Sequence, residues 1–117
     1  MTTRERGLWG EKQALSYLYL KGYTLVKKNF RSRFGEIDLI VNDNEYIVFV
    51  EVKVRRSSAF AHAREFVSRK KQGKMRSTAN LWLSSRPVEL QPRFDVIEIY
   101  SGDSFGEPQI NHIINAF

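Results

Sequence analysis

The chain has 117 residues, 42% of them hydrophobic and 27% charged, a balance that excludes a fibrous or disordered protein and fits one domain spanning residues 1–117. It contains no cysteine, which excludes disulfides and thiolate metal sites, so any metal must be held mainly by oxygen. A net charge of +6 favours a polyanion such as nucleic acid as partner, although a basic surface also simply aids solubility. Since no segment suits a signal peptide or a membrane span, we expect a cytoplasmic protein without a membrane partner.

An amphipathic helix is predicted over residues 4–21 at the start of the chain. Three leucines share one stripe at helical spacing with Glu11, and Gly22 follows as a stop signal. These leucines are Leu8, Leu15 and Leu18. Because this stripe should face the interior, we expect Glu11 to point toward the rest of the fold and not toward water.

Three β-prone runs follow the helix, at Thr24–Phe30, Glu36–Val41 and Tyr46–Arg55. Residues 31–35 suit a hairpin-like connection between the first two runs. The sequence Asn42-Asp43-Asn44-Glu45 is a turn signal between the second and the third. The three runs are therefore expected to be strands of one sheet.

The second half of the chain begins with an irregular segment over residues 57–62, which predicts a loop. A second helix should start after Ser68, a good N-cap residue, and end near Leu83. A fourth strand is predicted from Arg93 to Tyr100, and it should pair in parallel with an earlier strand across a right-handed crossover. The predicted fold is a mixed α/β sheet flanked by helices, in the order α-β-β-β-α-β.

Charged residues enter the predicted sheet at two places. The third strand is continuously apolar over residues 47–50 and then carries Glu51 and Lys53 on one face. In the second strand, Glu36 and Asp38 should share one face, which Ile40 continues in apolar form. The opposite face should take Ile37, Leu39 and Val41. If these strands are antiparallel neighbours, Asp38 and Glu51 lie side by side.

Two adjacent carboxylates in a covered region repel each other, so this pair needs a cation. Mg²⁺ or Mn²⁺ fits, because such ions take a few hard oxygen ligands, and Asp38, Glu51 and the backbone carbonyl of Val52 would supply them. Lys53 would orient the attacking water or stabilise the charge of a transition state, and Glu11 would bind the metal through a water or hold Lys53. The plainer interpretation is a solvated strand face with ion pairs worth about 0 to 1 kcal/mol each.

Two segments carry a resemblance to a known family. Glu36-Ile37-Asp38-Leu39-Ile40 and Phe49-Val50-Glu51-Val52-Lys53 resemble the PD-(D/E)xK nuclease signature, and more narrowly the YraN family of bacterial proteins related to Holliday-junction resolvases. The likeness extends over nearly the whole chain, and Ile37 stands where the superfamily has a proline. It implies a restriction-endonuclease-like fold and a Mg²⁺-dependent DNA endonuclease of repair or recombination, selective for branched or junction DNA. It also implies metal ligands at Asp38 and Glu51, a catalytic Lys53 and an accessory acid at Glu11.

Polar and basic residues near the predicted active face are candidate contacts to nucleic-acid phosphates. They are Arg31, Arg33, Arg55 and Arg56 beside the strands, and Lys70, Lys71, Gln72 and Lys74 in the second helix. A solvated helix face is the plainer interpretation for Arg69 and Lys74. It is weaker for Lys71, which shares a side of the helix with Met75 and Trp82.

Two classes of function remain open from the sequence. The first is a structure-selective or weakly sequence-dependent DNA endonuclease that cleaves phosphodiesters with Mg²⁺ or Mn²⁺. The second is a catalytically inactive nucleic-acid-binding module of a DNA-processing assembly. The gathered carboxylates favour the first, because a pure binding surface has no need of negative charge where phosphates approach. Symmetric cleavage of a junction would call for a homodimer. His62 and His112 are isolated and are interpreted as structural or surface residues.

Overall fold

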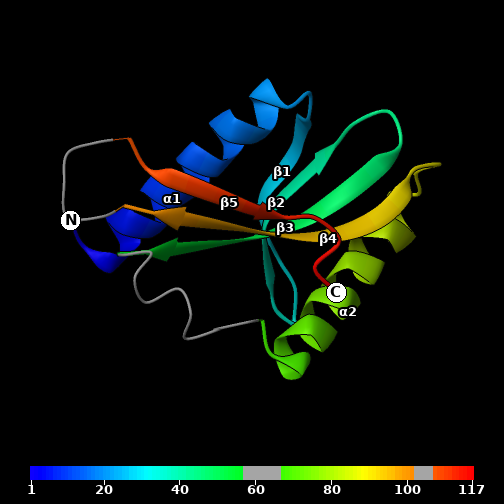
Figure 1. Cartoon of the computed structure of the whole chain (residues 1–117). Helices are drawn as coiled ribbons and strands as arrows, with labels where there is room; N and C mark the ends of the chain where they lie inside the picture. The colour runs from blue at the N-terminus through cyan, green and yellow to red at the C-terminus, as the bar shows by residue number, and fades with distance from the viewer. Residues whose placement is uncertain (57–66, 102–106) are drawn as a thin grey trace.

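The computed structural model describes residues 1–56, 67–101 and 107–117, and the predicted loop over residues 57–62, with His62, lies outside them. Within the described ranges the chain forms a mixed α/β structure, as predicted (Figure 1). Its elements are α1 (Thr3–Leu20), β1 (Thr24–Arg31), β2 (Glu36–Asn42), β3 (Tyr46–Arg55), α2 (Arg69–Ser85), β4 (Gln91–Tyr100) and β5 (Gln109–Ile113).

The strands form one sheet in the order β1-β2-β3-β4-β5. β3 and β4 pair in parallel, which confirms the predicted crossover through α2, and the other neighbours are antiparallel. The prediction did not include β5, which pairs with β4 and extends the order to α-β-β-β-α-β-β. This short strand is only partly buried, and its two isoleucines lie three residues apart instead of alternating with polar residues, so its hydrophobic signal is weak.

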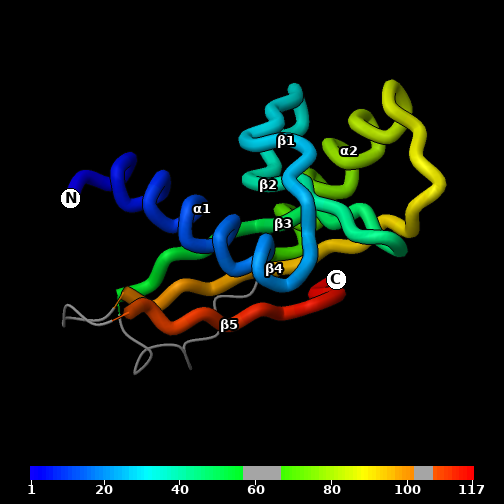
Figure 2. Tube along the Cα trace, turned by 90° about the horizontal axis from the view of Figure 1, so that it is seen from above, coloured from blue at the N-terminus to red at the C-terminus, as the bar shows by residue number. Residues whose placement is uncertain are grey.

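The two helices lie on opposite faces of the sheet, with α1 above it and α2 below it in Figure 1; Figure 2 shows the same arrangement from above. On the α1 face, Ala14 and Leu18 pack on one set of buried strand residues, whereas Met75 and Trp82 of α2 pack on the other set. Successive residues of β3 alternate between these clusters, as a strand covered on both faces requires.

The buried stripe of α1 differs from the predicted one. Gly10, Ala14 and Leu18 are its buried residues, whereas Leu8 is 54% exposed. At Gly10 the helix approaches β3 so closely that a Cβ atom would overlap the side chain of Val54. Small residues at these positions allow the close approach, and leucine spacing alone does not reveal it.

Capping interactions confirm the predicted end of α1 and the predicted start of α2. Gly22 has a φ of 95°, and the N–H of Tyr23 donates to the carbonyl of Leu18 at 3.0 Å, which closes the C-terminus of α1. At the start of α2, the Ser68 side chain accepts a hydrogen bond of 3.1 Å from the N–H of Lys71. This cap fixes the first turn of α2, which carries Lys70 and Lys71. In the described part of the chain, neither helix has the length and apolar composition needed to cross a membrane.

Candidate active site

The site lies where β2 and β3 stop pairing. Their antiparallel register runs from Asn42↔Ile47 to Leu39↔Val50. Beyond that point the Asp38 side chain takes over the role of a backbone partner, because its Oδ2 accepts the N–H of Val52 at 2.8 Å. The N–H and C=O of a strand residue point toward the same neighbour, so the Val52 carbonyl faces this opening as well.

The backbone of β1 is irregular at this level. Asn29 of β1 lies between the pairs Lys28↔Leu39 and Phe30↔Ile37, and therefore opposite Asp38. Its φ of 51° lies in the left-handed region, which asparagine tolerates better than most residues.

The faces of β2 change at the same level, which corrects the predicted alternation. Ile37 packs with Ile40 on the α2 face, whereas Leu39 and Val41 pack on the α1 face. Residues two apart in a regular strand share one face, so Ile37 and Leu39 depart from this rule across Asp38. Because of this irregularity, the Asp38 carboxylate reaches the backbone of β3 instead of projecting from one face of the sheet.

Three other carboxylates act on Asp38 in this region. The pKa of Asp38 is raised to about 7, first by burial and then by the charge of Glu51, with smaller contributions from Glu11 and Glu36. The hydrogen bond from Val52 acts in the opposite direction. The structure therefore brings together three predicted residues, Asp38, Glu51 and Glu11. It adds Glu36, which sequence reasoning had placed on the face of Asp38 but had given no role.

Lys71 of α2 provides the ammonium group that contacts Glu51 within the described residues. Its Nζ lies 2.5 Å from Glu51 Oε1, and the Glu51 side chain is only 8% exposed. Partial burial lowers the pKa of Lys71, but the hydrogen bond and charge of Glu51 outweigh it, so the pKa is raised. The predicted catalytic lysine, Lys53, lies two residues beyond Glu51 and shares its face by strand alternation.

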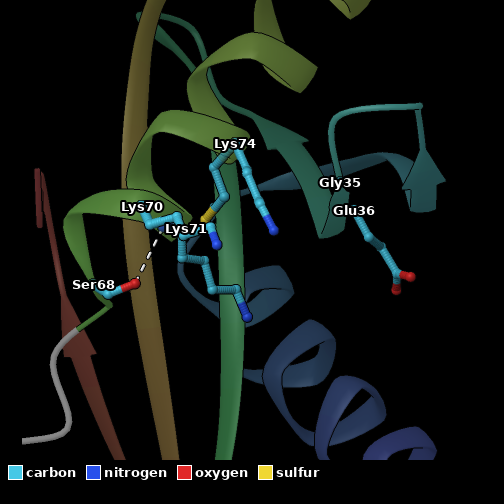
Figure 3. A pocket seen from close by; sticks show the side chains of 7 residues that line it. Gly35, Glu36, Ser68, Lys70, Lys71 and Lys74 are labelled. Atoms are coloured by element: carbon cyan, nitrogen blue, oxygen red, sulfur yellow. Dashed lines mark hydrogen bonds between the residues drawn. The ribbon is translucent and has the colours of Figure 1, made fainter.

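Two hollows meet beside the carboxylates, and Glu36 lines both of them. The first, of about 350 Å³, lies between α2 and the start of β2, with three lysines on its α2 side (Figure 3). These are Lys70, Lys71 and Lys74. The second, of about 580 Å³, lies between the first half of α1 and strands β1 and β2, and its lining includes Glu11, Asn29 and Arg31. Glu36 thus lies between a cationic hollow and a mixed one.

Several predicted phosphate contacts lie around the turn from β1 to β2 or at the end of β3. Arg31 forms an ion pair of 3.0 Å with Glu36, and its side chain remains 78% exposed. The guanidinium of Arg33 lies 4.8 Å from the centre of the Phe34 ring. Arg56 is exposed at the end of β3. These three arginines are accessible to a large anion.

Arg55 and Gln72 are engaged within the protein. Arg55 Nε lies 2.8 Å from Glu98 Oε2, and its side chain is 17% exposed. The Gln72 amide donates to the Val67 carbonyl at 2.9 Å, which secures the start of α2. Their contacts give both residues a structural role, whereas the lysines of α2 face a hollow.

A second polar cluster lies at β4 and β5, and sequence reasoning did not find it. Asp95, fully buried, accepts two hydrogen bonds from Arg93, at 2.9 and 2.8 Å, and its Oδ2 lies 2.7 Å from His112 Nε2. The hydroxyls of Tyr17 and Tyr23 contact His112 and Arg93. Burial raises the pKa of Asp95, but its hydrogen bonds outweigh this and lower it. The cluster ties α1, β4 and β5 together and is enclosed, so it is structural.

The donor set at β2 and β3 suits a hard cation. Among the described residues, no three His, Cys, Asp or Glu side chains are arranged as a ready-made metal cage. Mg²⁺ does not require one, because it keeps several waters and takes one or two carboxylates together with substrate oxygens. Asp38, Glu51 and the Val52 carbonyl match that pattern, and the pKa of Asp38 is raised first by burial and then by the charge of Glu51.

Comparison with known proteins gives a consistent family assignment. Residues 10–99 match the model of the uncharacterised protein family UPF0102. A UPF0102 protein of Syntrophomonas wolfei is 47% identical over 115 residues, covering 97% of this chain and 98% of that protein. One from Clostridioides difficile is 42% identical over 118 residues and covers both chains completely. These matches include both candidate motifs and confirm the resemblance to the YraN family: the chain belongs to the UPF0102, or YraN, family.

Proposed function

We propose that this protein is a divalent-metal-dependent nuclease that hydrolyses phosphodiester bonds in DNA. The observation that carries the proposal is the convergence of Glu11, Glu36 and Glu51 on Asp38, beside a hollow lined by lysines. The pKa of Asp38 is raised to about 7, first by burial and then by the charge of Glu51. Gathered carboxylates favour a divalent cation, and neighbouring ammonium groups favour a phosphate. A phosphodiester bound through such an ion satisfies both charges.

Each residue has a defined part in this proposal. Asp38 and Glu51 would hold Mg²⁺ or Mn²⁺ together with the Val52 carbonyl, and the bond from the Val52 N–H keeps the Asp38 carboxylate oriented. The ion would supply Lewis-acid activation of the phosphodiester. Lys53 would orient the attacking water and stabilise the negative charge that develops on the phosphoryl oxygens. Glu11 would position Lys53 or a water molecule from the α1 side.

The substrate we propose is a branched or junction DNA of repair or recombination, bound along the two hollows on either side of the carboxylates. The exposed Arg31, Arg33 and Arg56 would contact phosphates farther from the scissile bond. Cutting both arms of a symmetric junction would require a homodimer.

A catalytically inactive nucleic-acid-binding module is the second candidate. The lysines of α2 and the net charge of +6 suit it equally well. The partly buried Asp38 does not, because a binding surface gains nothing from a carboxylate whose ionisation is opposed by its surroundings.

The deciding experiment is a cleavage screen on branched and linear DNA and on RNA, in Mg²⁺, Mn²⁺ or EDTA. Wild type should cut at least one substrate only with metal. Lys53→Met should lower cleavage roughly 100-fold or more while DNA binding changes little, because the lost interaction belongs to the transition state. Lys21→Met is the matched control, since it removes the same charge at the far end of α1, and it should cut like wild type.

DNA binding without metal-dependent cleavage would contradict the nuclease proposal. If purified wild type binds DNA but cuts no substrate in either metal, and Lys53→Met is indistinguishable from it, the binding module takes its place.

A further inference from the structure

Glu51 has a cationic partner in the protein without any metal. The Lys71 ammonium lies 2.5 Å from Glu51 Oε1. It therefore occupies one of the two carboxylate oxygens with which Glu51 would bind a metal. Lys71 comes from α2, whereas the proposed catalytic Lys53 comes from β3 itself. The contact therefore joins two elements that the chain connects only through residues 56–68.

The two partners differ in their freedom to move. The Glu51 side chain is 8% exposed and belongs to a central strand, whereas the Lys71 side chain is 46% exposed and lies in the first turn of a helix. A lysine has four rotatable side-chain bonds, so its ammonium can leave Glu51 while the backbone stays in place. The hollow lined by Lys70, Lys71 and Lys74 is adjacent and provides space for it (Figure 3).

A divalent ion and the ammonium compete for the same carboxylate. Both are cations, and at the distance of a shared carboxylate they repel strongly in a partly covered site. An ion bound by Asp38 and Glu51 also neutralises the negative charge that holds Lys71 in place. Metal binding therefore weakens the attachment of Lys71 to Glu51.

We propose that Lys71 is a displaceable cation, which holds Glu51 in the metal-free protein and is released by the metal to bind a backbone phosphate in the hollow beside Lys70 and Lys74. The proposal rests on the metal centre of the proposed function. Its consequence is that metal and DNA bind cooperatively, because the metal frees a cation for the phosphate and the phosphate retains that cation away from Glu51. By linkage, each ligand must raise the affinity of the other by the same factor.

Two binding measurements test this, and neither requires turnover. The first is the Mn²⁺ affinity of the DNA-free protein, by calorimetry. Lys71→Met and Lys71→Gln should each bind Mn²⁺ roughly tenfold more tightly than wild type, because the competing charge is gone. Glutamine can still donate a hydrogen bond to Glu51, so Lys71→Gln keeps the test valid if Lys71→Met does not fold. Lys71→Arg keeps the charge and should stay near wild type.

The second measurement is the affinity for a labelled junction oligonucleotide in EDTA and in Ca²⁺. Wild type should gain roughly five- to tenfold in affinity from Ca²⁺, and Lys71→Met should lose most of that gain. Lys70→Met is the matched control, since it removes the same charge from the same hollow. It should weaken DNA binding in both buffers alike and leave the Mn²⁺ affinity within about twofold of wild type.

Failure of this inference can be told apart from failure of the proposed function. Mn²⁺ binding with equal affinity in wild type, Lys71→Met and Lys70→Met would overturn the displacement of Lys71 and leave the metal centre standing. A wild type that binds no Mn²⁺ would overturn both.

Discussion

Replacing Asp38 with asparagine is expected to stabilise the metal-free protein above neutral pH. The pKa of Asp38 is raised from the usual 3.8 to about 7, first by burial and then by the charge of Glu51. The folded state binds this proton more tightly than the unfolded state. The protonated Asp38 therefore contributes fully to the free energy of unfolding below about pH 4, and this contribution is lost as the pH rises through about 7. Asparagine carries no charge and keeps an oxygen that can accept the Val52 N–H.

The size of the effect follows from the same pKa. A rise from 3.8 to about 7, assigned to Asp38 alone, corresponds to roughly 4 kcal/mol of unfolding free energy. Asp38 keeps some contact with solvent, so we expect about half of this, ~2 kcal/mol. For a chain of 117 residues, that raises the melting temperature by roughly 8 °C.

Thermal melts followed by circular dichroism, in EDTA between about pH 4 and 8, measure the difference directly. Asp38→Asn should melt higher than wild type at the upper end of this range, and the two curves should coincide at the lower end. Saturating Mg²⁺ should then stabilise wild type more than the variant, because it binds the folded protein through Asp38. A variant that is less stable than wild type at pH 8, or equally stabilised at pH 4, would refute the crowding of negative charge at this site.

Three further changes test other parts of the structure. Gly10→Ala should destabilise the protein by about 1 to 3 kcal/mol in urea unfolding, because its Cβ overlaps Val54 where α1 approaches β3. Asp95→Asn should cost about 3 to 5 kcal/mol in the same assay, since it leaves a buried guanidinium without its counter-charge. Replacing Lys70 and Lys74 with alanine should reduce the slope of log affinity for DNA against log salt by about 1.8, measured by fluorescence anisotropy; an unchanged slope would place the DNA elsewhere.

Much of the fold follows from local patterns in the sequence. The boundaries of β3 coincide with the predicted ones, since its long apolar run ends in alternating charges. Gly22 and Ser68 mark helix ends because their roles depend on a few neighbouring backbone groups. The charged residues in the predicted strands β2 and β3 also indicated that Asp38 lies near Glu51, because a short turn sets the register of two antiparallel strands.

Other features depend on contacts between distant segments, and only the tertiary structure decided them. The buried face of α1 is set by Gly10, because its approach to β3 outweighs the hydrophobicity of an exposed Leu8. The attachment of Lys71 to Glu51 joins residues 20 apart, on a helix and a strand whose spacing no local pattern encodes. The sequence by itself thus determined which side chains could form a carboxylate site, since that depends on residue type and strand alternation. The packing of α2 against the sheet determined which lysine contacts it, since that contact depends on where two separate elements meet in space.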